Sequence, residues 1–292
     1  MNNLSERERT PKLSNLTVRI LSALGLAPVV LALVYVGGWP FSLLLMGAAI
    51  LMAGEWSRLA YGPKPAAYAK PECWLVAAAA VAAVLGLMVG LSWLALAAPV
   101  LAALIGAGWR LAQNQPIGSL LFGVAYIAAP VIALTVLRAD AVLGLTAVLW
   151  VLAIVWATDI FAYAAGRLIG GPKLAPRYSP NKTWAGLGGG VMGAAAAGAG
   201  MALWAGANPL FLAVLSACLA VLAQFGDFVE SALKRRAGVK DSGSLIPGHG
   251  GILDRVDGLM FAAAGAALVG GVMVVLTNGP DSSGSIAAAI LR

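Results

Sequence analysis

Charged residues, histidine and cysteine are all scarce in this sequence of 292 residues. Only 11% of the residues are charged, whereas soluble domains carry about 25%. Because 61% of the residues are hydrophobic, the chain fits neither an ordinary soluble domain nor a disordered one. The single histidine argues against a zinc site, and the two cysteines, Cys73 and Cys218, lie at or inside apolar segments and predict no disulfide framework.

Long apolar runs take the place of the missing charges. Each run is long enough to cross a hydrocarbon core of roughly 30 Å. Turn sequences such as GGWP and QNQP separate the runs, so the chain is predicted to be an all-α, polytopic integral membrane protein with about nine transmembrane helices. The predicted spans are 20–37, 41–57, 73–90, 93–109, 118–137, 141–165, 184–205, 209–230 and 256–277.

The basic residues fall almost entirely on one side of this predicted topology. If the N-terminus is cytoplasmic, every lysine and arginine except Arg138 and Arg292 lies in a cytoplasmic segment, as the positive-inside rule requires. The first apolar run continues into GGWPFSLLL without a small-residue cleavage site, which predicts an uncleaved span. The net charge of +7 then follows largely from topology, and we expect no nucleic-acid partner.

Polar sequence is concentrated in the second half of the chain. Two predicted cytoplasmic loops, 166–183 and 231–255, are basic and rich in Gly, Pro and Ser, and the first half has no counterpart. We therefore divide the chain into a transmembrane scaffold (1–140), a catalytic transmembrane region (141–277) and a short C-terminal tail (278–292).

Acidic residues accompany these loops. A charged residue at the centre of a span costs about 3 kcal/mol or more and usually marks a function. Two of the acid pairs are spaced i, i+3, so that each pair shares a helix face. The acids are Asp159 in the sixth span, Asp227 with Glu230, and Asp254 with Asp257. The alternative is internal ion pairing, of the first pair with Lys234 and of the second pair with Arg255.

The combination of residue types indicates phosphate chemistry. Several carboxylates without clustered histidine or cysteine suit a hard cation such as Mg²⁺. Lysine and arginine would hold phosphates and neutralise the charge that develops in a phosphoryl-type transfer. The DSGSLIPGHGG segment can aim backbone N–H groups at phosphate oxygens. The pattern therefore favours Mg²⁺-dependent phosphate or nucleotide chemistry at the cytoplasmic membrane surface.

Two further features leave alternatives open. His249 is a phosphate donor, a proton carrier or a hydrogen-bonded loop residue. The segment SPNKTWAGLGGG offers polar side chains to a nucleotide or a phosphate, although the chain has no G-x-x-x-x-G-K-[ST] sequence. The glycines that follow, from Gly186 to Gly193, favour close packing between helices.

A long, gapped polar pattern carries a resemblance to a known family. The stretch SALKRRAGVKDSGSLIPGHGGILDRVD, Ser231 to Asp257, resembles the signature of the phosphatidate cytidylyltransferase family, also called CDP-diglyceride synthase. The upstream stretch TDIFAYAAGRLIGGPKLAPRYSPNKTWAG resembles the segment that precedes this signature in the family. The signature positions present are Ser231, Lys234, Arg235, Lys240, Asp241, Gly243, Pro247, His249, Gly250, Gly251, Asp254, Arg255 and Asp257.

The resemblance implies transfer of cytidylyl from CTP to phosphatidic acid in phospholipid biosynthesis, which gives CDP-diacylglycerol and pyrophosphate. It implies Mg²⁺ on Asp227 and Asp254, with Asp257 as a further ligand, and a monovalent cation such as K⁺ in the same site. The implied catalytic residues are Asp227, Lys234, Asp254, Arg255, Asp257 and His249. The expected substrate-binding residues are Ser179, Asn181, Lys182, Thr183, Lys234, Arg235, Lys240, Asp241, Gly250 and Gly251. Ala185 departs from the family, which often has a glutamate there.

The expected partners are CTP, phosphatidic acid and the lipid bilayer, and a homodimer is compatible with the sequence. The Ala- and Gly-rich spans favour a bacterial inner membrane, with the active site facing the cytoplasm. The alternatives are an ether-lipid cytidylyltransferase, a CTP-dependent polyprenol kinase and, from another class, an ion-coupled transporter. A CDP-alcohol phosphotransferase is disfavoured, because the DG-x-x-A-R pattern of that family is missing after Asp257 and Gly258.

Overall fold

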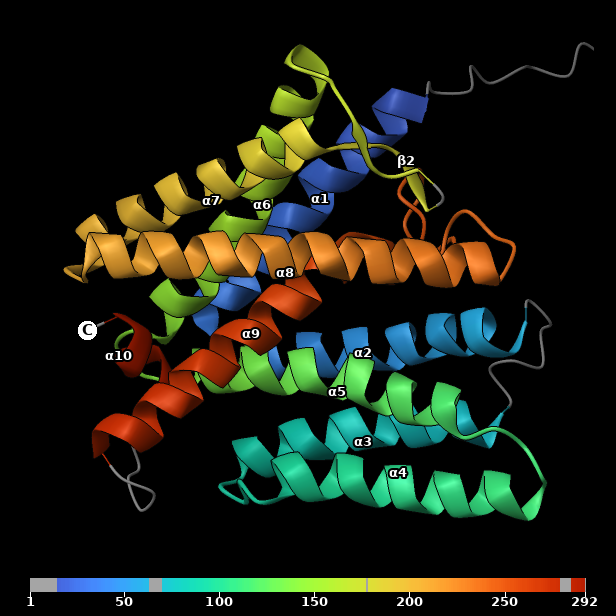
Figure 1. The fold of residues 1–292 in the computed structure, drawn as a ribbon. Helices are drawn as coiled ribbons and strands as arrows, with labels where there is room; N and C mark the ends of the chain where they lie inside the picture. Colours follow the sequence, from blue (N-terminus) through green and yellow to red (C-terminus); the bar gives the residue numbers. More distant parts are fainter. Residues whose placement is uncertain (1–14, 63–69, 177, 279–284, 292) are drawn as a thin grey trace, which may run out of the picture.

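Helices form almost all of the computed structural model, which describes residues 15–62, 70–176, 178–278 and 285–291. Within these residues, nine long helices overlap the nine predicted spans (Figure 1). The all-α prediction is confirmed. The helices are α1 (Asn15–Val36), α2 (Gly38–Tyr61), α3 (Pro71–Met88), α4 (Leu94–Ala112), α5 (Gly118–Arg138), α6 (Gly144–Leu168), α7 (Trp184–Ala205), α8 (Pro209–Arg236) and α9 (Leu253–Asn278).

Eight of these helices, α2 to α9, are long and apolar enough to cross a membrane, judged by length and composition over the described residues. A polytopic membrane protein is therefore confirmed. The described apolar part of α1, Leu24–Val36, is shorter. The ninth crossing therefore stays a prediction.

Alternate helix ends gather on one side of the molecule. The ends of α2, α4 and α8 and the starts of α3 and α5 lie on the side that carries strand β2 (Ser179–Thr183) (Figure 1). The last turns of α2, α4 and α8 contain Arg58, Arg110 and Lys234, whereas Arg138 ends α5 on the opposite side. This arrangement agrees with the one-sided distribution of basic residues. The cytoplasmic placement of the N-terminus stays a prediction.

The glycine-rich start of α7 packs at close range against α6. A Cβ atom at Gly190 would lie 3.0 Å from the carbonyl oxygen of Thr158, and one at Gly186 would lie 3.0 Å from that of Ala162. Both glycines are buried. Side chains at these positions would push the two helices apart, so the helix-packing interpretation of the glycines is confirmed.

The first predicted cytoplasmic loop, 166–183, contains a hairpin that the sequence did not predict. Strands β1 (Lys173–Ala175) and β2 pair antiparallel, with Lys173 opposite Thr183 and Ala175 opposite Ser179. Strand β2 leads directly into α7, where the Thr183 hydroxyl accepts a hydrogen bond of 3.0 Å from the backbone N–H of Gly186. This N-cap fixes the junction between the hairpin and the helix.

The second predicted loop, 231–255, is shortened from both ends. Helix α8 continues to Arg236, past the predicted end of its span at 230. Three consecutive basic residues in its last turn stabilise that end through the helix dipole. Helix α9 begins at Leu253 rather than at 256. A short helix, α10 (Ile286–Leu291), lies in the predicted C-terminal tail and contacts α9, with Ile290 and Leu291 buried.

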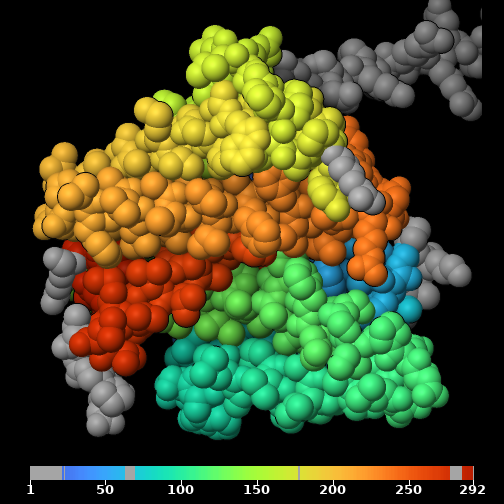
Figure 2. Space-filling view, viewed as in Figure 1, coloured from blue at the N-terminus to red at the C-terminus, as the bar shows by residue number. Residues whose placement is uncertain are grey.

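Helix α9 joins the two halves of the molecule. It packs against α8 on one side and against α5 on the other. In the space-filling view, α7, α8, α9, α5 and α4 follow one another as bands from gold through orange and red to green (Figure 2). The loop between α8 and α9 therefore lies within reach of helices from the first and the second half of the sequence.

Candidate active site

Asp254, in the first turn of α9, fixes the loop that precedes it. Its Oδ2 atom accepts hydrogen bonds from the backbone N–H and the hydroxyl of Ser242, both at 2.9 Å, and from the Gly251 N–H at 2.8 Å. Its Oδ1 atom accepts a hydrogen bond from Lys234 Nζ at 2.7 Å. Lys234 also forms an ion pair of 2.5 Å with the buried Glu230. This buried network ties the end of α8, the loop and the start of α9 together.

Glu55 of α2 holds the same loop from the other half of the chain. Its carboxylate accepts hydrogen bonds from the backbone N–H groups of Ile252 and Leu253, each at 2.9 Å. It also lies 3.0 Å from the Ser242 hydroxyl, whose single proton it shares with Asp254. The side chain is buried. A carboxylate at a helix N-terminus satisfies otherwise unpaired N–H groups and interacts favourably with the helix dipole. Glu55 therefore acts as a remote cap on α9.

Sequence reasoning missed Glu55. The available signal was a lone acid in the apolar run of the second span, since charged residues in spans are rare. Nothing in the local sequence identifies its partners, which lie almost two hundred positions further along the chain.

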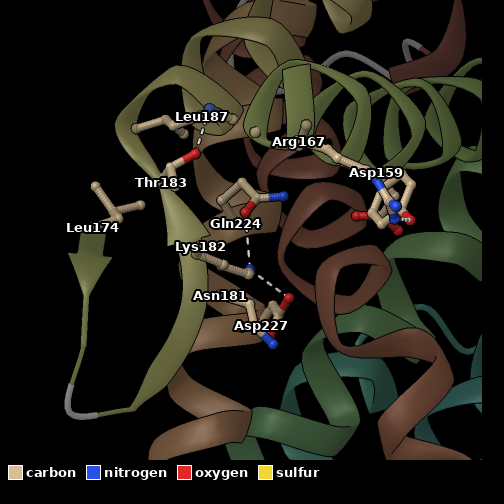
Figure 3. A pocket seen from close by; sticks show the side chains of 13 residues that line it. Asp159, Arg167, Leu174, Asn181, Lys182, Thr183, Leu187, Gln224 and Asp227 are labelled. Atoms are coloured by element: carbon tan, nitrogen blue, oxygen red, sulfur yellow. Dashed lines mark hydrogen bonds and ion pairs between the residues drawn. The ribbon is translucent and has the colours of Figure 1, made fainter. Parts of the chain in front are cut away.

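A polar pocket lies between α6, α8 and the β2–α7 junction (Figure 3). Its volume is about 430 Å³. Lys182 of β2 donates a hydrogen bond of 2.9 Å to Gln224 Oε1 and forms an ion pair with Asp227, and its ammonium lies 4.6 Å from the centre of the Phe228 ring. The ammonium of Lys182 is thus held in place over the α8 face that lines the pocket.

The opposite wall of the pocket comes from α6. Asp159, Tyr163 and Arg167 line it, and the Arg167 guanidinium donates a hydrogen bond of 2.8 Å to the Tyr163 hydroxyl. Arg167 and Gln224 were not among the predicted site residues and join the candidate site only in the structure. Arg167 belongs to the upstream stretch that resembles the family, and Gln224 lies outside both quoted stretches. The pocket therefore combines two cations, two carboxylates and two amides, the amides being Asn181 and Gln224.

Asp159 of α6, Asp227 of α8 and Asp257 of α9 interact electrostatically, although their side chains do not form a compact cluster among the described residues. A Cβ atom at Gly226 would lie 2.5 Å from the backbone oxygen of Asp257, so α8 and α9 approach each other closely beside Asp227. Asp257 lies within Coulombic range of both Asp227 and Asp159. Asp227 also accepts a hydrogen bond of 3.2 Å from Ser231.

The alternative of internal ion pairing holds in part. Lys234 pairs with Glu230, as that alternative predicts, and also with Asp254. Asp227 pairs instead with Lys182 from the hairpin. Among the described residues, Arg255 forms no salt bridge with Asp254 or Asp257.

Five further predicted residues lie at the end of α8 or in the loop that follows it. Gly250 has φ +84°, and a Cβ atom there would lie 2.5 Å from Asp254 Oδ2, so both its backbone and its contacts require glycine. The backbone N–H of His249 donates to the Ile246 carbonyl at 2.9 Å. The Nδ1 atom of His249 is buried without a hydrogen-bond partner in the described part of the chain. Arg235, Lys240 and Asp241 are exposed.

The donor set suits a hard cation. Mg²⁺ is commonly held by one or two carboxylates, and substrate phosphates and water complete its shell. Within the described ranges no three Asp, Glu, His or Cys side chains form a ready cage. Asp227 and Asp254 each face a lysine ammonium. The carboxylate oxygens of both aspartates therefore already face a positive charge, as they would face a bound cation.

The model of the cytidylyltransferase family matches residues 17–273. The chain belongs to the cytidylyltransferase family. A phosphatidate cytidylyltransferase of Brucella abortus (strain 2308) is 38% identical over 264 residues, which cover 89% of this chain and 95% of that relative. One of Bacillus subtilis (strain 168) is 43% identical over 120 residues, covering 40% of this chain and 45% of that relative. One of Mycobacterium leprae (strain TN) is 44% identical over 108 residues, covering 37% and 35%.

The matched region of this cytidylyltransferase includes both halves of the candidate site. It contains Glu55 on α2 as well as the pocket and loop residues of α6 to α9. The resemblance inferred from the signature-like sequence is therefore confirmed at the level of the family.

Proposed function

We propose that this cytidylyltransferase transfers the cytidylyl group of CTP to phosphatidic acid and releases pyrophosphate. The observation that carries the proposal is the buried carboxylate network that fixes the glycine-rich loop at the end of α8, together with a polar pocket that the same helix lines and that contains Lys182 and Arg167. Relatives named phosphatidate cytidylyltransferase, similar over nearly the whole chain, support the same conclusion.

The polar pocket is the proposed CTP site. Its volume of about 430 Å³ lies within the range of roughly 300–1,000 Å³ that is usual for small-molecule sites. Lys182 and Arg167 supply positive charge for the triphosphate, and Asn181 and Gln224 supply polar amide groups. Lys182 is held by its contacts with Asp227 and Gln224.

Mg²⁺ is the proposed cofactor, and Asp227, Asp254 and Asp257 would hold it, with K⁺ as a candidate second cation. When bound, such a cation neutralises charge on the phosphates and on the departing pyrophosphate. Lys182 and Lys234 pair with carboxylates here. In the proposed complex, their ammonium groups would pair with phosphate oxygens instead.

The proposed reaction is an in-line displacement. A phosphate oxygen of phosphatidic acid forms a bond to the α-phosphorus of CTP, and the bond from that phosphorus to the bridging oxygen of the β-phosphate breaks. The attacking oxygen is already an anion at neutral pH, so no strong general base is needed. The chain's own task is then to position two anionic substrates and to compensate their charge.

The proposed setting is the cytoplasmic face of a bacterial inner membrane. The end of the molecule that carries the loop and the hairpin also carries most of the described basic helix ends. A basic face of this kind attracts anionic headgroups and nucleotides. Assembly as a homodimer remains a proposal, to be tested by the mass of the purified protein in nanodiscs.

The test is an assay of the purified chain with CTP, dioleoyl phosphatidate and Mg²⁺. We expect label from the α-phosphate of CTP to appear in the lipid, with one pyrophosphate released per liponucleotide. Transfer of the γ-phosphate label would indicate a lipid kinase instead. A higher kcat/KM for an ether-linked phosphatidate would move the assignment to an ether-lipid enzyme. CTP-independent ion flux without any liponucleotide would refute the proposal.

A further inference from the structure

A second, apolar cavity of about 540 Å³ is lined in part by the glycine-rich loop. Helices α1, α2, α5, α6 and α9 form its walls, and Leu245, Ile246 and Ile252 contribute from the loop region. Helix α1 is linked to this loop by a hydrogen bond of 3.0 Å from the Ser22 hydroxyl to the Pro247 carbonyl. We call this cavity the apolar groove.

One charged residue lines the apolar groove. Arg255, in the first turn of α9, is the only Lys, Arg, Asp or Glu among the groove residues in the described part of the chain. It is exposed and forms no salt bridge among the described residues. It lies within Coulombic range of Asp159, which lines the polar pocket. Arg255 therefore stands between an apolar compartment and the proposed CTP site.

The groove has the length of one membrane leaflet. On α2 it extends from Phe41 to Met52, which corresponds to about 16 Å of helix. Half of a hydrocarbon core of roughly 30 Å is close to this length. An aliphatic chain lying along α2 would thus be accommodated while its polar end stays near the loop.

We propose that the apolar groove binds an acyl chain of the phosphatidic acid substrate, with the lipid phosphate at Arg255. This inference rests on the proposed function and adds the location of the lipid substrate. Charge complementarity favours an anionic lipid over a neutral one, because an unpaired guanidinium at the end of an apolar cavity attracts a phosphate. The lipid phosphate would then face the pocket that holds the α-phosphorus of CTP.

Gly47 of α2 offers a way to fill the groove without disturbing the fold. It lines the groove, and a Cβ atom there would meet nothing within 4 Å. Gly108 of α4 is a matched control, because it is also helical with nothing within 4 Å of its Cβ position, and it is exposed outside the groove. Gly47→Phe and Gly108→Phe therefore differ mainly in whether the new ring enters the groove.

The experiment measures KM for dioleoyl and for dioctanoyl phosphatidate, at equal surface fractions in mixed micelles. Each methylene kept out of apolar surroundings weakens binding about fourfold. We expect Gly47→Phe to raise the KM for the long-chain lipid at least about tenfold more than that for the short-chain lipid. Gly108→Phe should leave both values at the wild-type level. Equal KM changes for the two lipids, or none, would overturn the groove assignment.

A binding measurement separates this inference from the proposed function. A phosphatidate with a diazirine near the end of one acyl chain should label α1 or α2 peptides, and excess phosphatidate should compete. Labelling confined to α3 and α4, or equal competition by phosphatidylethanolamine, would overturn the inference. If the wild-type chain forms no liponucleotide, the proposed function fails. If it forms liponucleotide but Gly47→Phe shows no chain-length effect, only the groove assignment fails.

Discussion

Replacement of Glu55 by glutamine tests whether α2 positions the catalytic loop. The carboxylate accepts hydrogen bonds at both oxygens, from Ile252 N–H on Oε1 and from Leu253 N–H on Oε2, where it also shares the Ser242 hydroxyl proton with Asp254. In Glu55→Gln one oxygen becomes an NH₂ group, which faces a donor and cannot accept. At least one hydrogen bond is lost, together with the negative charge at the start of α9.

The magnitude follows from these contacts. A hydrogen bond to a charged group contributes about 1.5–3 kcal/mol, and a charge at a helix N-terminus contributes about 0.3–2 kcal/mol. We therefore expect Glu55→Gln to lower the free energy of unfolding by about 2–5 kcal/mol. Because the same loop holds Asp254, we also expect kcat of the folded enzyme to fall at least about tenfold, which corresponds to ~1.4 kcal/mol of activation free energy.

Glu72 provides the matched control. It is a second buried glutamate in the first half of the chain, and it pairs with Arg110 at 2.6 Å between α3 and α4, away from the loop. Glu72→Gln should also lower the unfolding temperature in detergent, but kcat per folded molecule should stay at the wild-type level. The positioning role of Glu55 would be refuted if both variants lost kcat equally, or if Glu55→Gln kept wild-type kcat.

Three further predictions address the pocket, the helix interface and the cation. Lys182→Met removes the ammonium that faces Asp227, so steady-state kinetics should show a higher KM for CTP and a lower kcat, each by about tenfold; wild-type values would contradict the CTP site. Gly190→Leu forces a side chain toward the Thr158 carbonyl and should lower the free energy of unfolding by about 1–3 kcal/mol. Gly188→Leu is the control, because the space around its Cβ position is open, and it should leave the free energy of unfolding unchanged. Equal destabilisation of the two variants in thermal unfolding would contradict the close α6–α7 packing. EDTA should abolish activity, and added Mg²⁺ should restore it, while the unfolding temperature changes little because lysines already pair with the carboxylates; full activity in EDTA would rule out the cation.

The helices were predictable from the sequence because their determinants are local. Each span is an apolar run of sufficient length, and length and hydropathy alone decide whether such a run can cross a membrane. Close packing of α7 against another helix was equally predictable, since glycines spaced along one helix allow close approach, but the sequence did not identify α6 as the partner. The boundaries were less certain where charged residues continue a helix past the hydrocarbon region, as Lys234 and Arg235 do at the end of α8.

The partners of most of the acids were not predictable, because they depend on contacts between segments that are distant in the sequence. The i, i+4 pair of Glu230 and Lys234 could be foreseen from spacing. The pairing of Asp227 with Lys182 needs the hairpin to fold back over α8. The contact of Glu55 with the loop needs α2 to pack beside the start of α9. Sequence spacing contains no information about either event.

The structure separates two roles of the aspartates, support of the loop and binding of a cation. Asp254 accepts four hydrogen bonds that hold the loop, so loss of activity in Asp254→Asn would not distinguish a structural role from a cation ligand. Asp227, with a side chain 31% exposed and one lysine partner, carries far less of the loop's support. Asp227→Asn is therefore the sharper test of the cation site: it should weaken the Mg²⁺ dependence of the rate while the unfolding temperature stays close to that of the wild type.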